Sequence, residues 1–329
     1  MDNVTHTLTG LILARTGLER WCPRSIWILP LAANTPDIDI ISAFGGSLEY
    51  LSWHRHITHS LAALPVIALL PVAVVRLFGP IPWWRAWLVA GIGILSHLLL
   101  DLTNMYGVRL LLPFTAKWFR LDTTAVVDVW IWAALAFAIF WPALSGLVSS
   151  EIGAVKTRGR GLAIAAVLFL MAYNGGRYFL HQRAVAVMES RLYEGGPPRQ
   201  VVALPSAFSP LRWVGIIDTD SSVAVRSVDL ASAYDPAAGR NLYKPQDLPP
   251  IKAALGTPEV REFLRFSQLP YWRLTPAPDP EGGVRVEVMD LRFGTPPEER
   301  FVTTVLLDSE LRPIESRFTF GPFRPGALR

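Results

Sequence analysis

The sequence predicts a polytopic α-helical membrane domain, with four long spans and two short hydrophobic helices, followed by a soluble α+β domain. Of the 329 residues, 51% are hydrophobic and only 18% are charged, whereas charged residues make up about 25% of a typical soluble domain. The apolar residues gather in long runs before residue 182, and most of the 12 tryptophans lie in the same part of the chain. Tryptophan is enriched where a bilayer meets water. We therefore expect a membrane domain over residues 1–182 and a soluble domain over 183–329.

Four apolar runs are long enough to cross a bilayer, which takes about 20 residues of helix. They are residues 60–78, 84–100, 125–148 and 161–180. Two shorter segments, 8–14 and 26–33, are expected as half-spans packed against the others or as buried helices. The turn at 79–82, made of one glycine and two prolines around an isoleucine, should make the first two long spans antiparallel.

Beyond residue 182 the pattern becomes that of a water-soluble domain. Apolar and polar residues alternate over 222–226 and 284–288, and alternation with period two predicts half-buried antiparallel strands. Thr257 followed by Pro258 is typical of a helix start, so we expect a helix from there to about Phe266. No histidine follows residue 182, and we therefore expect the chemistry to lie in the membrane domain.

Charge and cysteine content exclude some classes of partner and site. The net charge of +4 is small and the chain has no long basic run. This argues against nucleic acid as a partner and favours a membrane lipid or a lipid-linked substrate. The single cysteine, Cys22, excludes an intrachain disulfide and a multi-cysteine zinc site.

Ionisable side chains gather near the predicted span ends. Five of the six histidines lie in the first 100 residues, and ionisable groups at membrane depth are costly unless they are paired or bound to something. Antiparallel spans bring the start of one beside the end of the next, so these groups should meet at one membrane face. The residues expected there are His54, His56, His59, His97, Asp101, Asp122 and Asp128. His6, Asp37 and Asp39 join them if segment 8–14 enters the membrane from this face and segment 26–33 returns to it.

Two local patterns suit a metal ion. The spacing of His97 and Asp101 puts both side chains on one helix face, about a turn apart, where they can grip one ion. Asp37 and Asp39 point the same way if the chain is extended, which suits two ligands or a ligand and a general base. The alternatives are a helix-end ion pair without metal and a solvated turn. Imidazole and carboxylate together suit zinc, which we expect first, or manganese or iron.

Arg55 lies between two candidate ligands, His54 and His59. Its guanidinium could clamp a phosphate or carboxylate of a substrate through two hydrogen bonds. A salt bridge to Asp37 or Asp39 is an equally good interpretation.

Four motifs, in this order, resemble the YdjM-like family of membrane-bound, metal-dependent hydrolases. They are Asp2-x-Val4-Thr5-His6, Pro36-Asp37-x-Asp39, His54-Arg55-x-x-Thr58-His59-Ser60 and His97-x-x-x-Asp101, and the resemblance covers residues 1 to about 135. It implies a metal site at His6, Asp37, Asp39, His54, His59, His97 and Asp101. It also extends to Asp128, although Val129 replaces a proline that often follows. His56 stands where the family usually has glycine, so no role is carried over to it.

The expected function is metal-dependent hydrolysis of a membrane-associated ester, such as a lipid phosphoester, with Asp37, Asp39 and Arg55 as catalytic candidates. The alternative is a non-enzymatic metal-binding membrane protein: a regulator, a scaffold or an ion carrier. We expect a multi-pass protein of the bacterial inner membrane. The short connections opposite the site, above all 156–160, carry more Lys and Arg than those on the site's side. Such residues mark the cytoplasm, so the site and the C-terminal domain should face the periplasm.

Overall fold

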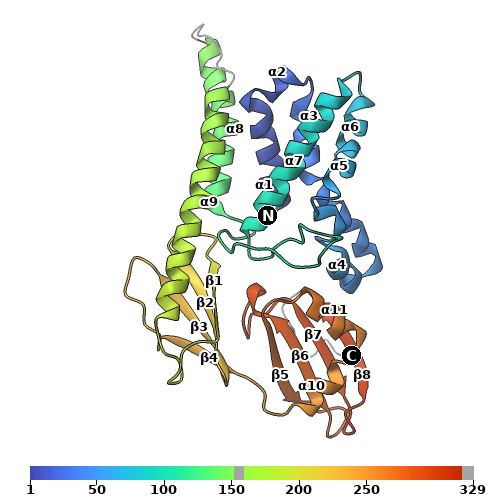
Figure 1. The fold of residues 1–329 in the computed structure, drawn as a ribbon, viewed down its shortest axis with the longest axis vertical. Coiled ribbons are helices and arrows are strands. Elements are labelled where there is room, and N and C mark those ends of the chain that lie inside the picture. The colour runs from blue at the N-terminus through green and yellow to red at the C-terminus, as the bar shows by residue number, and fades with distance from the viewer. Residues whose placement is uncertain (152–158, 321–329) are drawn as a thin grey trace.

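The structure is a computed structural model, and it describes residues 1–151 and 159–320. Helices fill one end of the molecule and two β-sheets fill the other, with the N-terminus between them (Figure 1). The helical part consists of α1 (Asn3–Leu13), η1 (Ala14–Leu18), α2 (Glu19–Trp21), α3 (Ser25–Asn34), η2 (Pro36–Gly45), α4 (Ser47–Trp53), η3 (Ile57–His59), α5 (Leu64–Ile67), α6 (Leu69–Arg76), α7 (Trp83–Thr103), α8 (Val129–Glu151) and α9 (Arg160–Glu189).

Helix α3 packs between α1 and α7, and two glycines allow the close approach. A Cβ atom on Gly10 of α1 would lie 2.8 Å from the Leu29 carbonyl carbon, and one on Gly93 of α7 would lie 2.8 Å from Ala32 Cβ. Both distances are shorter than real Cβ contacts, so glycine is required at both positions. This packing holds α1 and α7 against a common partner and fixes the side chains near their ends.

The predicted four long spans are only partly present. Among the described residues, α7 and α9 are long and apolar enough to cross a membrane, and they coincide with the predicted runs 84–100 and 161–180. The segments Ser47–His59 and Leu64–Arg76 count as one further span only if they form a broken span bent by 89°. Two further apolar stretches of 10–17 residues are α3 and Val129–Pro142, and the latter belongs to the 23-residue helix α8, which coincides with the predicted run 125–148.

The prediction of one continuous span over 60–78 is therefore wrong. Its residues form two short helices, α5 and α6. Pro65 and Pro71 fall in the first turns of these helices, where a missing N–H removes no helical hydrogen bond. Proline thus favours two helix starts here over one uninterrupted helix.

Helix α9 joins the helical part to the first sheet. It runs unbroken from Arg160 to Glu189, so the expected domain boundary at 182 falls inside it. Beyond that point Ala184 and Met188 pack into a core with Trp213 and Ile217 of the sheet.

The C-terminal part contains two antiparallel sheets, each with its strands in chain order. The first consists of β1 (Gln200–Pro205), β2 (Arg212–Asp218), β3 (Ser222–Asp229) and β4 (Gly239–Tyr243). The second consists of β5 (Pro270–Pro276), β6 (Val284–Asp290), β7 (Val302–Leu307) and β8 (Pro313–Thr319), preceded by α10 (Pro249–Ala254) and α11 (Pro258–Phe266), with η4 (Leu291–Phe293) after β6. The alternating segments predicted as strands lie in β3 and β6, and the predicted helix is α11.

The second sheet and the helical part share one hydrophobic core. Leu51 of α4 and Tyr106, which follows α7, are buried together with Phe263 and Phe266 of α11. Arg292 crosses the same boundary, because its guanidinium donates hydrogen bonds to the backbone oxygens of Met105 and Tyr106 at 3.1 and 2.8 Å. The C-terminal part is therefore packed directly against the segment that follows Asp101.

Candidate metal centre

Three fully buried side chains form the centre of the polar cluster. His59 comes from η3, and His97 and Asp101 come from successive turns of α7. His97 Nε2 lies 3.1 Å from His59 Nε2 and 3.3 Å from Asp101 Oδ2, and His59 Nε2 lies 3.6 Å from the same oxygen. The spacing of four residues thus brings the imidazole of His97 and the carboxylate of Asp101 together.

Asp37 adds a fourth potential ligand from η2. Its Oδ1 lies 3.4 Å from His59 Nε2 and 3.8 Å from His97 Nε2. Ligands about 2.0–2.2 Å from a tetrahedral zinc ion lie about 3.3–3.6 Å from one another, so these separations resemble the edges of a coordination shell. Burial opposes ionisation of Asp37, but the hydrogen bond from His59 and the nearby imidazoles outweigh it and lower the pKa to about 2. The carboxylate is therefore ionised at neutral pH, as a metal ligand must be.

The Nδ1 contacts of the two central histidines direct their Nε2 atoms towards each other, where a cation could bind both. His97 Nδ1 lies 2.7 Å from the backbone oxygen of Ala33. A carbonyl only accepts, so Nδ1 carries the proton and Nε2 presents a lone pair. His59 Nδ1 similarly faces Asp39 Oδ2 at 3.3 Å. The two Nε2 atoms lie 3.1 Å apart, and a cation bound between them would replace the proton on His59 Nε2 and be coordinated by both nitrogens.

His6 completes the cluster from α1. Its ring is fully buried, stacks on His97 with centroids 3.8 Å apart, and places Nε2 3.4 Å from Asp101 Oδ1. Neither ring nitrogen has a hydrogen-bond partner among the described residues, and Asp101 Oδ2 also lacks one. Each unpaired buried polar group costs about 1–3 kcal/mol. The donor set and these orphaned atoms fit a divalent cation.

Asp39 supports two histidines and its oxygens are already engaged. Oδ1 lies 3.1 Å from His54 Nδ1, and Oδ2 accepts the backbone N–H of Arg55 at 2.8 Å and the Thr58 hydroxyl at 3.3 Å. Burial opposes ionisation of Asp39, but the hydrogen bonds from His54 and His59 hold its pKa well below the ordinary value. A carboxylate behind an imidazole is the arrangement that orients histidine ligands in many metal sites.

The guanidinium of Arg55 is buried and hydrogen-bonded within the protein. Its guanidinium donates to Asp101 Oδ1 at 2.9 Å, to the backbone oxygen of Gly107 at 2.9 Å and to Asn104 Oδ1 at 3.3 Å. It also lies 4.4 Å from the centre of the Tyr106 ring. The amino group of Met1 contacts the same Asp101 oxygen. Arg55 therefore pairs with Asp101, and not with Asp37 or Asp39 as the sequence suggested.

Several expected site residues lie apart from this centre. Within the described chain, the His and Asp groups close enough to hold one ion are His6–Asp37–His97, His59–His97–Asp101 and Asp37–Asp39–His54. Asp128 is in none of them: it caps α8 through the backbone N–H groups of Trp130 and Ile131 and accepts the hydroxyl of Tyr173. His56 and Asp122 are likewise absent from these groups, and Asp122 pairs with Arg120.

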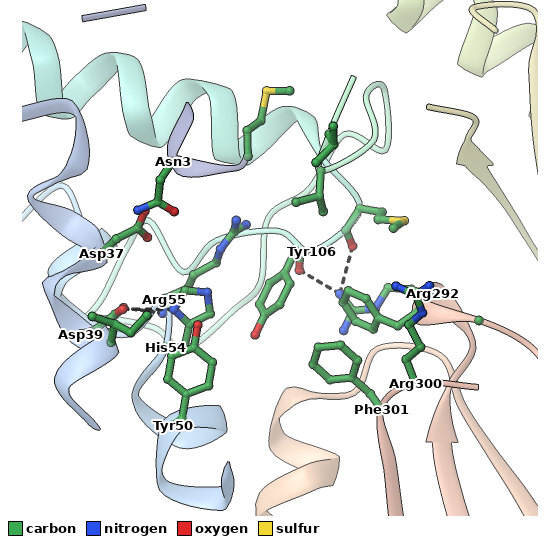
Figure 2. A pocket seen from close by; sticks show the side chains of 17 residues that line it. Asn3, Asp37, Asp39, Tyr50, His54, Arg55, Tyr106, Arg292, Arg300 and Phe301 are labelled. Carbon is green, nitrogen blue, oxygen red and sulfur yellow. Dashed lines mark hydrogen bonds and ion pairs between the residues drawn. The ribbon is translucent and has the colours of Figure 1, made fainter. Parts of the chain in front are cut away.

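A cavity of about 660 Å³ opens beside the third of these groups. Figure 2 shows Asp37, Asp39 and His54 on one side of it and Arg292, Arg300 and Phe301 of the C-terminal part on the other. Sequence reasoning missed this second wall, because these residues follow the histidines by about 200 positions and carry no motif. Tyr106 was missed as well, although it follows Asp101 closely in the chain.

The fold and the cluster define a helical membrane protein with a buried His–Asp centre next to a C-terminal α/β region. The chain belongs to the YdjM inner membrane protein family, whose match covers residues 1–184. Residues 249–321 match the YfhP C-terminal alpha/beta plait domain.

Two relatives extend this assignment. The chain is 28% identical over 334 residues to the uncharacterized protein YfhP of Bacillus subtilis, covering 97% of this chain and 94% of that protein. It is 35% identical over 120 residues to the inner membrane protein YbcI of Escherichia coli, covering 35% of this chain and 69% of that protein. No solved structure matches the chain.

Proposed function

We propose that this protein hydrolyses a membrane-associated ester, most simply a lipid phosphoester, with a divalent cation bound at the His–Asp centre. The observation that carries the proposal is a set of separations of 3.1–3.8 Å, which join His59 Nε2 and His97 Nε2 to each other and to carboxylate oxygens of both Asp37 and Asp101. His6 is the fifth candidate ligand. We expect zinc, with manganese or iron as alternatives, because imidazole and carboxylate donors suit all three.

Such a cation would lower the pKa of a bound water towards about 7 and polarise the ester oxygen. Around it, Arg55 holds Asp101 in place through the hydrogen bond at 2.9 Å. Asp39 orients His59 and His54, so we assign it a supporting role next to the ligands. Asp37 lies at the boundary between the buried centre and the cavity, and its side chain is 14% exposed.

His54 is our candidate for the general base. Its Nδ1–H donates to Asp39, and its Nε2 has no hydrogen-bond partner among the described residues. The ring lines the cavity. An imidazole held by a carboxylate in this way can accept the proton of an attacking water. Asp37, with a pKa of about 2, is too weak a base for that task and better suited to ligation.

The proposal is tested with full-length protein purified in detergent without a polyhistidine tag. We expect stoichiometric metal and hydrolysis of bis(p-nitrophenyl) phosphate or p-nitrophenyl butyrate that stops on chelation and returns on adding the metal. His54→Gln should keep the metal and lose most of the activity. Bound metal without hydrolysis of either substrate would contradict the enzymatic assignment.

A non-enzymatic metal protein remains the second candidate, because His59, His97 and Asp101 are completely buried. A closed shell of this kind is typical of structural metal sites, whereas catalytic sites keep an open position. The cavity next to Asp37 and His54 favours the enzyme. In the same assay a structural metal would exchange slowly and support no turnover.

We further propose that the centre and the C-terminal part face the periplasm, on the basis of the basic residues in the opposite connections. A reporter that is active only after export should be active when fused to the C-terminus and inactive when inserted within 156–160. The opposite pattern would place the centre in the cytoplasm.

A further inference from the structure

Three arginines line the cavity beside the metal centre, and two of them are already bonded. Arg55 pairs with Asp101, and Arg292 pairs with Asp290 and donates to the backbone oxygens of Met105 and Tyr106. Both are buried. Arg300 differs from them, because it is exposed and makes no hydrogen bond or ion pair with any described residue.

Arg300 faces the metal centre across the cavity. It precedes β7 in the second sheet, and Figure 2 shows it on the wall opposite Asp37 and Asp39. A ligand in this cavity would thus touch the proposed metal centre at one end and, at the other, a guanidinium that has no partner among the described residues. The planar guanidinium can bind a phosphate through two parallel hydrogen bonds. A volume of about 660 Å³ is within the range of pockets that hold ligands of drug size.

The surroundings indicate that this ligand comes from the bilayer. Ile40 and Val127 line the cavity together with the polar groups. The outer face of η2, next to Asp39, exposes Ile40, Ile41 and Phe44, and the Phe44 side chain is 94% exposed. Asp37 of the same element lies 3.8 Å from His97 of α7, a candidate membrane span, and exposed apolar side chains on an element so close to a span are suited to the interfacial region of a bilayer. A lipid head group could therefore enter the cavity while its acyl chains stay in the membrane.

We propose that Arg300 binds the phosphate of a lipid head group in this cavity, so that the C-terminal region supplies the specificity for an anionic lipid. This inference rests on the proposed hydrolase function only for the hydrolysis of the bound lipid. Binding itself requires the cavity and Arg300, and no turnover.

The test measures binding to full-length, metal-loaded protein by calorimetry, with short-chain lipids as probes. The probes are dihexanoyl phosphatidic acid, the neutral dihexanoyl glycerol, and inorganic phosphate. Arg300→Gln is compared with wild type and with Arg312→Gln. Arg312 is a matched control because it is an exposed arginine of the same sheet, in the turn between β7 and β8, paired with Asp308.

We expect Arg300→Gln to bind phosphatidic acid at least about tenfold more weakly than wild type, which corresponds to about 1.4 kcal/mol. Its metal content and its affinity for dihexanoyl glycerol should be unchanged, and Arg312→Gln should behave as wild type. Equal affinity of Arg300→Gln and wild type for phosphatidic acid would overturn the proposal. Inorganic phosphate binding as tightly as the lipid would overturn the assignment to a lipid. Arg300-dependent binding without any hydrolysis would support this inference and contradict only the hydrolase proposal.

Discussion

Asp101 and Asp128 offer the sharpest test of which carboxylates hold the metal. Both are fully buried aspartates near span ends, and the sequence resemblance assigns both to the metal site. Asp101 lies 3.3 Å from His97 and 3.6 Å from His59, whereas Asp128 caps α8 and accepts the Tyr173 hydroxyl. Replacing each by asparagine keeps the shape and removes the charge.

Asp101→Asn should lose the metal and destabilise the protein. It removes one ligand and leaves Arg55 without the carboxylate that it contacts at 2.9 Å. Breaking a buried pair by removing one partner costs about 3–5 kcal/mol. A loss of that size in metal binding would weaken the affinity about 100- to 4000-fold, at about 1.4 kcal/mol per tenfold. Asp128→Asn should keep the metal, because asparagine also caps helices well.

The assay is competition for zinc against a chelator of known affinity, together with the thermal unfolding temperature in detergent. Equal zinc affinity in wild type and Asp101→Asn would refute the ligand assignment. A similar loss of affinity in Asp128→Asn would show that the region before α8 contributes to the centre after all.

Three further predictions concern residues around the centre. Asp39→Asn should weaken metal binding by about 10- to 100-fold without abolishing it, the effect usual for a carboxylate behind a histidine ligand, and the same chelator competition measures it. Tyr106→Ala should lower stability by about 3–5 kcal/mol, as for other buried aromatic residues, because the ring is buried against Phe266 and lies under Arg55. Tyr106→Phe should lower the thermal unfolding temperature much less. Equal effects of the two variants would contradict the role of the ring in packing. Burial raises the pKa of Asp122 to about 6, although the charge of Arg120 opposes this shift. The folded state therefore retains a proton that the unfolded state releases from about pH 4. The contribution of Asp122 to the free energy of unfolding is lost as the pH rises to about 6. Asp122→Asn should remove this component from the dependence of unfolding temperature on pH between 4 and 6.5, and identical profiles for variant and wild type would contradict it.

Much of the centre can be predicted from the sequence. Some of its residues are close together in the chain, and the others are indicated by the free-energy cost of placing ionisable groups in a membrane. The spacing of His97 and Asp101 fixes their proximity on one helix, whatever the helix packs against. The expense of ionisable groups at membrane depth predicts that the histidines before residue 100 should converge. His6, His59 and His97 do lie together in the structure.

Other features depend on packing that no local pattern encodes. The run at 60–78 is apolar throughout, so hydropathy predicts a span, while the positions of Pro65 and Pro71 divide it into two helices. The carboxylate of Asp128 could ligate a metal, but it caps the start of α8 through hydrogen bonds from the backbone. The salt bridge of Arg55 to Asp101 requires the positions of η3 and α7 to be known.

The C-terminal wall of the cavity was the least predictable part. Arg300 belongs to no motif in the sequence. The packing of Tyr106 against the second sheet brings Arg300 to the cavity that Asp37 also lines. The same packing suggests that the C-terminal part supports the centre, because Arg292 is bonded to the segment that follows Asp101.

X-ray absorption spectroscopy of protein purified without a polyhistidine tag and without chelator tests the central claim most directly. We predict bound zinc, or another divalent transition metal, with two or three imidazole nitrogens and carboxylate oxygens at about 2.0–2.2 Å. The imidazole contribution should fall in His97→Ala and stay unchanged in His56→Ala. Protein that binds no metal, or metal with no imidazole in its first coordination shell, would contradict the account.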